Sequence, residues 1–340
     1  MTFNYSPFVS VIIPCRNEKK FILKCLDSLI KQDYPKDKME ILVADGRSED
    51  GSGEMVREYA EKYSFVKLLD NPKKFTPFGL NIGIKNSKGE VIVRIDAHAD
   101  YEGDYVSKCV KYLKELEADN VGGVLKTLPA QNTIWARAIA FSLSSPFGAG
   151  GSYFRTGSKT IREVDTVFGG CFKRKVFDKV GLYNEKLRRS QDFEFNKRLK
   201  KAGGKIFLIP ETIACYYPPP RLKDFLKHNF TDGFWVTYPL KFNIRIFSWR
   251  HLIPLVFLST LIVLVVFSFV SKFFFLLFLL VIIFYFLVSF SFSFKVAGKE
   301  KDIRLLFVLP VVFAIRHFGY GAGSILGLVK IYGKKKRERN

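Results

Sequence analysis

The chain has 340 residues, with 54 Lys or Arg and 32 Asp or Glu, so its formal net charge is +22. That length suits a large α/β domain with an appendage, and the positive charge favours phosphates, nucleic acid or an anionic membrane as partners. Nucleic acid is not expected, because the chain lacks zinc-finger spacing, an RNP-like strand and a basic heptad region. The five cysteines are scattered and form no Cys-x-x-Cys pair. This argues against a disulfide framework or zinc site and indicates a reducing compartment.

Residues 9–125 alternate short apolar runs with amphipathic segments. This pattern predicts strands at 9–13, 40–44, 65–69 and 90–95, and helices at 19–31, 53–63 and 77–86. Apolar runs without polar alternation are typical of strands buried on both faces, and strands joined by helices imply a mostly parallel sheet. Residues 127–165 lose the periodicity and are expected to form a mobile excursion or a long surface loop.

The expected fourth strand ends at a polar cluster. Asp96 follows the strand, His98 comes two residues later, and Asp100 two after that. Residues two apart in an extended chain share a face, and ligands of open parallel sheets bind outside the carboxyl ends of the strands. A divalent cation with a phosphate donor fits there, although an acid after a strand is also common turn chemistry. Asp100 is expected to be only a turn or helix-capping residue.

The C-terminal third has a membrane pattern. Residues 221–251 interleave aromatic and basic side chains, which predicts an amphipathic interfacial segment. Residues 252–294 predict a two-helix transmembrane hairpin, since 252–270 and 273–294 are each long enough to span a bilayer.

The last apolar stretch, 305–329, is interrupted by Pro310, Arg316, His317 and several glycines. Basic clusters lie before it at 295–304 and after it in the tail 330–340, and the positive-inside rule places both on the cytoplasmic side. We therefore expect a re-entrant or interfacial segment followed by a basic cytoplasmic tail.

Several motifs, taken in order, resemble the family 2 glycosyltransferases of the GT-A fold, in the membrane-anchored branch similar to bacterial exopolysaccharide (succinoglycan-type) glucosyltransferases. They are Val9–Glu18, Ile41–Gly51, Asn81 with Gly83, Asp96-Ala97-His98 and Gln191-Asp192-Phe193-Glu194. The resemblance implies an α/β, Rossmann-like catalytic domain with a mostly parallel central sheet over residues 1–220. Its nucleotide-binding half would be 9–125 and its acceptor half 126–220.

The resemblance also implies roles for individual residues. Asp192 would be the catalytic base, with Glu194 as second choice, although both acids could simply stabilise a helix N-terminus. Asp96 and His98 would hold a divalent cation, Mn²⁺ or Mg²⁺. The donor side would comprise Pro14, Asn17, Glu18, Asp45, Asn81, Arg94 and Asp96, and the acceptor side Gly169, Gly170, Gln191 and Arg155.

Some of these roles have alternatives. Asp45 could be a turn residue before Gly46, and Arg94 could pair with an acid instead of neutralising a diphosphate. Gly169 and Gly170 could mark a strand bend instead of an acceptor site.

Two departures from the family pattern shape the expected function. His98 replaces the second Asp of the metal motif, and Asn229–Trp235 stands where processive synthases carry Gln-x-x-Arg-Trp, which favours transfer of one sugar. The expected protein is a multi-pass membrane enzyme with a cytoplasmic catalytic domain, acting in polysaccharide or glycolipid biosynthesis. It would move one sugar, with inversion, from a UDP-hexose to a lipid-linked or polyprenyl-phosphate acceptor. The alternative is an inactive assembly protein that binds nucleotide without transfer, and self-association is left open.

Overall fold

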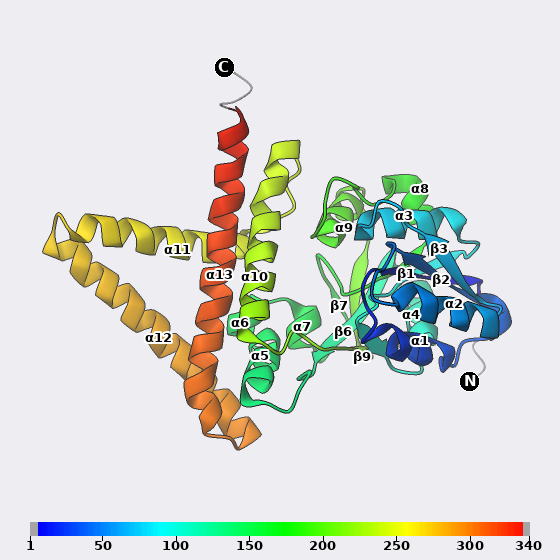
Figure 1. Cartoon of the computed structure of the whole chain (residues 1–340), viewed down its shortest axis with the longest axis horizontal. Helices are drawn as coiled ribbons and strands as arrows, with labels where there is room; N and C mark the ends of the chain where they lie inside the picture. The colour runs from blue at the N-terminus through cyan, green and yellow to red at the C-terminus, as the bar shows by residue number, and fades with distance from the viewer. Residues whose placement is uncertain (1–5, 336–340) are drawn as a thin grey trace. The chain divides into compact units, whose positions relative to one another are not determined.

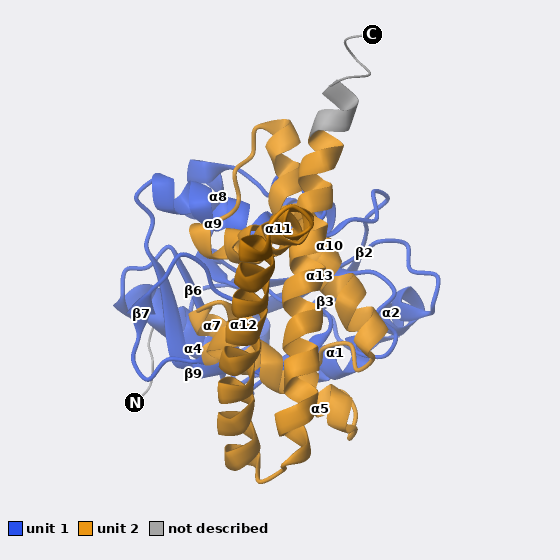
Figure 2. Ribbon diagram, turned by 90° about the vertical axis from the view of Figure 1, so that its left-hand side faces the viewer, with its two compact units in different colours: residues 1–126, 157–216 blue, residues 127–156, 217–340 orange. Residues whose placement is uncertain are grey.

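The computed structural model describes residues 6–335. The chain forms two compact units (Figure 2). Unit 1 comprises residues 1–126 and 157–216, and unit 2 comprises residues 127–156 and 217–340. The path of the chain is drawn in Figure 1.

Unit 1 is built on a mixed sheet of nine strands within the described residues. The strands follow the order β3-β2-β1-β4-β8-β6-β9-β5, and β7 pairs with β9. The predicted α/β class is confirmed, and its parallel part consists of β1 to β4. The remaining five strands pair antiparallel, so the sheet as a whole is mixed. The strands are β1 Val9–Cys15, β2 Met39–Asp45, β3 Val66–Asp70, β4 Val91–Arg94, β5 Ala99–Tyr101, β6 Asn120–Thr127, β7 Arg162–Glu163, β8 Cys171–Lys173 and β9 Ile206–Tyr216.

The strand order reverses between β1 and β4, which are direct neighbours. The helices that follow β1 and β2 lie on one side of these strands and α3 on the other (Figure 1). This reversal is the topological switch point at which α/β sheets open a crevice beyond the strand ends. The helices of unit 1 are α1 Ile22–Ile30, η1 Lys36–Lys38, α2 Ser52–Lys62, α3 Thr76–Asn86, α4 Tyr105–Glu115, α8 Lys175–Val180 and α9 Gln191–Lys201.

A buried carboxylate joins the amino ends of the parallel strands. Glu40 accepts hydrogen bonds from Ser10 Oγ at 2.7 Å, Lys67 Nζ at 2.9 Å and the backbone N–H of Lys88 at 2.7 Å. Ser10 Oγ in turn accepts the N–H of Gly89. Because Glu40 is only 2 % exposed, this set of charge-assisted bonds is what makes its burial tolerable.

The expectation that residues 127–165 form a mobile excursion or a long surface loop is wrong for about half of that range. The segment forms α5 Ile134–Ser144, α6 Pro146–Ala149 and α7 Tyr153–Thr156, and Thr133 caps α5 by accepting the N–H of Ala136. Ala138, Ile139, Ala140 and Ser142 are all nearly inaccessible to solvent. α5 is thus apolar over most of its surface and lacks the polar face that marks a helix in a sequence.

Unit 2 also contains the C-terminal helices: α10 Leu222–Thr237, η2 Tyr238–Phe242, α11 Trp249–Ser268, α12 Lys272–Glu300 and α13 Arg304–Lys335. Within the described part of the chain, three of them, α11, α12 and α13, are long and apolar enough to cross a membrane. α12 continues past the expected end at residue 294, through the first basic residues that follow it.

α13 is one continuous helix, and its glycines do not interrupt it. A Cβ on Gly323 would lie 1.9 Å from the carbonyl oxygen of Phe230, and one on Gly327 would lie 2.2 Å from Thr237 Oγ1. The glycines therefore let α10 and α13, which run side by side in Figure 1, approach at backbone distance. A re-entrant fold would need a break that α13 does not have. Whether the helix crosses or lies along the membrane stays a prediction.

Arg316 and His317, in the middle of α13, have partners inside unit 2. Arg316 Nη1 donates to Asn229 Oδ1 at 2.7 Å, and its Nε donates to the carbonyl of Gly148. The two ring nitrogens of His317 lie 3.0 Å from the hydroxyl of Tyr285 and 3.0 Å from the carbonyl of Phe147. These contacts satisfy the two adjacent ionisable side chains that interrupt the apolar stretch of α13.

Candidate functional site

The centre of the candidate site is Arg94, the last residue of β4, which is 4 % exposed. Its Nη2 lies 2.8 Å from Asp96 Oδ1, and its Nη1 lies 2.5 Å from Asp192 Oδ2. Burial alone would lower the pKa of Arg94, but the charges of Asp192 and Asp96 raise it above its usual range. The guanidinium therefore stays charged and joins an acid after β4 to an acid at the start of α9.

Asp192 lies in the first turn of α9, and its side chain is 29 % exposed. Burial raises the pKa of its carboxyl; the charge of Arg94 opposes this shift, and the charge of Asp96 adds to it. Its Oδ1 is buried and has no hydrogen-bond partner among the described residues. An ionised oxygen without a protein donor is suited to accept a proton from a bound hydroxyl.

Glu194, the second-choice base, has a different environment. Arg198 donates two hydrogen bonds to Glu194, from Nε to Oε1 at 2.7 Å and from Nη2 to Oε2 at 2.9 Å. The same guanidinium donates to the carbonyls of Val180 and Leu182. Arg198, which Glu194 holds in place, thus ties α9 to the end of α8 and the residues after it. Gln191 is buried beside Glu194 at 7 % exposure.

The candidate metal ligands lie in the turn after β4. The backbone N–H of Asp96 donates to the hydroxyl of Tyr101 at 3.0 Å, which anchors the turn. His98 Nδ1 lies 3.4 Å from Glu18 Oε1. Burial lowers the pKa of His98, but the hydrogen bond to Glu18 and the charges of Asp96 and Glu18 raise it overall. Glu18, expected on the donor side, therefore orients the imidazole.

The described residues hold no group of three or more His, Cys, Asp and Glu that could bind a metal ion. Asp96 and His98 still fit a cation that takes its remaining ligands from a diphosphate and water, as Mg²⁺ usually does. A carboxylate on one ring nitrogen is also the usual support of a metal-binding histidine, and Glu18 supplies it at Nδ1.

The loops after β1 and β2 are joined by hydrogen bonds between their polar residues. Asp45, level with Cys15 in the register, accepts the N–H of Ser48 at 3.0 Å and its hydroxyl at 2.6 Å. Asn17 has φ +57° and accepts the N–H of Glu49. Pro14 is partly exposed near the end of β1. Asp45 therefore has the contacts of a turn residue, and its role on the donor side stays a prediction.

Three other predicted residues make contacts that sequence reasoning did not foresee. The Asn81 amide donates to Tyr183 O and Glu185 Oε1, each at 2.9 Å, and accepts the Tyr183 N–H. Gly170 O accepts the N–H of Arg94, and a Cβ on Gly169, which has φ +68°, would lie 2.9 Å from the Arg94 carbonyl. The backbone that the glycines approach closely is thus that of β4.

Arg155 belongs to α7 of unit 2, so it is not among the residues that unit 1 brings together. Two supporting residues were missed: Tyr101, described above, and Asp50, which accepts the N–H groups of Lys19 and Ser52. The acid- and serine-rich run Asp45–Ser52 was the available signal for Asp50. Tyr101 had none beyond its position in a short strand.

Comparisons with known proteins identify the family. The family model described as "Glycosyl transferase family 2" matches residues 10–181. A relative from Methanococcus voltae, "Dolichyl N-acetyl-alpha-D-glucosaminyl phosphate 3-beta-D-2,3-diacetamido-2,3-dideoxy-beta-D-glucuronosyltransferase", is 30% identical over 233 residues, covering 66% of this chain and 72% of the relative. "Succinoglycan biosynthesis protein ExoA" of Rhizobium meliloti (strain 1021) is 29% identical over 268 residues, covering 72% and 80%.

Among solved structures, the mannosyltransferase PcManGT from Pyrobaculum calidifontis, in complex with GDP-Man and Mn²⁺, matches with a TM-score of 0.63 at 19% identity. The match covers 96% of this chain and 88% of that one. At this identity the likeness concerns the fold.

Proposed function

This chain belongs to glycosyl transferase family 2, and on that premise we propose that it transfers one sugar, with inversion, from a nucleotide sugar to a lipid-linked or polyprenyl-phosphate acceptor. The observation that carries the proposal is the bridge in which one buried guanidinium holds both Asp96 and Asp192. It joins a carboxylate suited to hold a cation beside the donor diphosphate to a carboxylate suited to deprotonate an acceptor.

The proposed reaction is a single displacement. The acceptor oxygen forms a bond to the anomeric carbon while the bond from that carbon to the diphosphate oxygen breaks. The acceptor proton passes to Asp192 Oδ1, the oxygen without a partner among the described residues, and the nucleoside diphosphate leaves with the electron pair. Attack opposite the leaving group inverts the anomeric centre.

Arg94 positions this step and is not expected to bind diphosphate. Its two amino groups already face carboxylates, and the carbonyl and N–H of its own backbone are held against Gly169 and Gly170. Holding a base in fixed geometry contributes to the rate because the reacting groups need no further ordering.

We propose that Asp96 and His98 would hold a divalent cation, Mn²⁺ or Mg²⁺, with Glu18 orienting the imidazole. When bound, such a cation stabilises the negative charge of the leaving diphosphate as a Lewis acid. An imidazole ligand suits Mn²⁺ better than Mg²⁺. The mannosyltransferase from P. calidifontis, whose structure is in complex with Mn²⁺, supports a divalent cation in general.

The proposed site for the nucleoside is formed by Asn17 and Asp45, in the loops after β1 and β2, together with Pro14. UDP-hexose is the first donor to test. The acceptor class rests on the M. voltae relative, whose name specifies a dolichyl phosphate-linked substrate. It also rests on the apolar helices of unit 2, which would keep the enzyme among such lipids. The basic residues after α12 and in the tail favour a cytoplasmic catalytic domain.

The decisive experiment uses membranes that contain the full chain. They are incubated with UDP- and GDP-sugars and with Mn²⁺ or Mg²⁺, and the lipid extract is examined by mass spectrometry. A hexose adduct that forms with the wild type and disappears with Asp192→Asn is expected. The competing function is an inactive nucleotide-binding assembly protein, which the replacement of the second Asp of the metal motif by His98 permits. Nucleotide binding without turnover of any donor would establish that competitor.

A further inference from the structure

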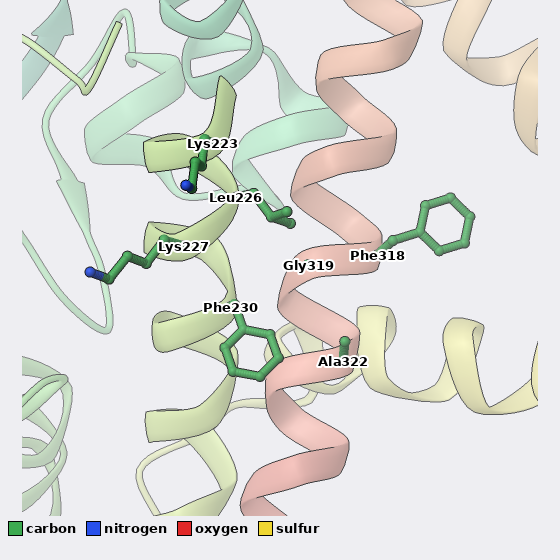
Figure 3. A pocket seen from close by; sticks show the side chains of 7 residues that line it. All are labelled: Lys223, Leu226, Lys227, Phe230, Phe318, Gly319 and Ala322. Atoms are coloured by element: carbon green, nitrogen blue, oxygen red, sulfur yellow. The ribbon is translucent and has the colours of Figure 1, made fainter. Parts of the chain in front are cut away.

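A groove of about 530 Å³ lies along the contact of α10 and α13 within unit 2 (Figure 3). Leu226 and Phe230 of α10 and Phe318 and Ala322 of α13 supply its apolar lining, and Lys223 and Lys227 belong to its α10 side. A Cβ on Gly319 would lie 2.8 Å from Leu226 Cδ1. The glycine therefore brings the helix backbone close and leaves room that a larger residue would fill.

The groove carries charge at one side only. Lys223 and Lys227 are four residues apart on α10, so they share a face, and Figure 3 shows both side chains extending to the same side of the helix. Both are exposed, and neither ammonium forms an ion pair with a carboxylate within residues 6–335. Asp224 follows Lys223 directly but does not line the groove.

An apolar channel beside two unpaired lysines matches a molecule with a hydrocarbon chain and an anionic head. Lysines next to membrane helices attract acidic lipid head groups, and an apolar surface open to the bilayer is covered by acyl chains. We propose that this groove binds an anionic phospholipid of the surrounding membrane. Its phosphate lies at Lys223 and Lys227, and one acyl chain lies along Leu226, Phe230, Phe318 and Ala322. The proposal rests on unit 2 being in a membrane and is independent of catalysis.

The test uses the full chain in a neutral detergent and native mass spectrometry of bound lipid. The probes are phosphatidylglycerol, phosphatidylcholine with the same acyl chains, a polyprenyl phosphate and inorganic phosphate. One variant combines Lys223→Gln with Lys227→Gln, and a second, Ala322→Leu, fills the channel while keeping both lysines. The matched control combines Lys299→Gln with Lys301→Gln, two exposed lysines at the end of α12.

We expect the wild type to prefer phosphatidylglycerol to phosphatidylcholine. Loss of the two lysines should weaken phosphatidylglycerol binding roughly 30-fold, as two charges near an anionic lipid surface imply. Ala322→Leu should also weaken it, and the control should not. Tryptophan fluorescence shows whether each variant is folded, since Trp135, Trp235 and Trp249 all lie in unit 2.

Three results would overturn the proposal. An equal loss of phosphatidylglycerol binding in the control and the groove variants would mean that the lipid is attracted non-specifically by positive charge. Binding of inorganic phosphate as tightly as lipid, unaffected by Ala322→Leu, would mean an ion site without a chain site. Preference for polyprenyl phosphate over phosphatidylglycerol would make the groove an acceptor site. None of these outcomes depends on turnover, so failure here is distinguishable from failure of the proposed reaction.

Discussion

Arg94 Nη1 lies 2.5 Å from Asp192 Oδ2, although the two residues are 98 positions apart and belong to β4 and α9. The pair is enclosed, with the Arg94 side chain 5 % exposed and that of Asp192 29 %. Charges at this distance interact strongly where water is largely excluded. The ion pair therefore fixes α9, and the proposed base on it, against the end of the strand that carries Asp96.

Replacing Arg94 by Lys should separate positioning from binding. A lysine keeps the charge but is a point donor that cannot hold two carboxylates as a planar fork does. We expect kcat to fall on the order of 100-fold, the loss typical of a misplaced catalytic group, and the KM for the donor to change much less. Mn²⁺ binding, measured by electron paramagnetic resonance without donor, should weaken within the 10–100-fold range of outer-shell changes.

The matched control for that variant is Arg174→Lys. Arg174 is a partly buried arginine that donates to the carbonyls of Gly89 and Ser87, before β4 begins. The Arg174→Lys variant should lower the stability of unit 1 without the selective loss of kcat expected for Arg94→Lys. A fall in kcat of the same size in both variants, or a rise in donor KM alone for Arg94→Lys, would refute the positioning role.

Glu194→Gln should reduce stability more than turnover. Its carboxylate is held by Arg198, which also secures two backbone carbonyls, so the neutral amide loses a charge-assisted pair worth roughly 1–3 kcal/mol. Unfolding of unit 1 can be followed by thiol labelling, because all five cysteines lie there and four of them are buried. If Glu194→Gln abolishes sugar transfer with an unchanged labelling midpoint in urea, Glu194 is the base.

The sequence predicted the parallel strands well because their apolar runs are continuous and each ends at turn residues. It named Asp96 and Asp192 as candidate site residues, but it did not predict the link between them. From the sequence, Arg94 could equally have neutralised a diphosphate. Its ion pair with Asp192, 98 residues away, leaves no local pattern in the sequence. α5 was missed because it lacks a polar face. The glycines of α13 suggested a break in the helix, because the sequence does not show that they make room for the backbone of α10.

The buried Glu40 should make unit 1 sensitive to acid. Burial would raise the pKa of Glu40, but the hydrogen bonds from Ser10, the Lys88 N–H and Lys67 lower it below its ordinary value of 4.5. A carboxyl whose pKa is depressed on folding contributes stability above its unfolded pKa and loses it as the pH falls through the folded pKa. The wild type should therefore become less stable as the pH falls below 4.5.

Glu40→Gln tests this assignment in the full chain. At pH 7 it should destabilise unit 1 by about 1–3 kcal/mol, because its partners keep at most part of their hydrogen bonds. The difference from wild type should shrink as the pH falls. Thiol labelling in urea, with a pyridyl disulfide at each pH, measures both values. A difference that stays constant from pH 7 down to the acid range would contradict the role of the Glu40 charge.

The glycine contact of α10 and α13 should tolerate no side chain at Gly323. A Cβ there would lie 1.9 Å from the Phe230 carbonyl oxygen, so even Gly323→Ala must push the two helices apart. Overpacking of this kind costs typically about 1–3 kcal/mol. The matched control is Gly298→Ala in α12, where a Cβ meets nothing within 4 Å. That change should be neutral or slightly stabilising, because alanine favours the helix by up to about 1 kcal/mol.

Denaturation followed by tryptophan fluorescence reports the stability of unit 2 for both variants, and thiol labelling of unit 1 should be unchanged in both. Equal midpoints for the two alanine variants would show that α10 and α13 do not depend on contact at backbone distance.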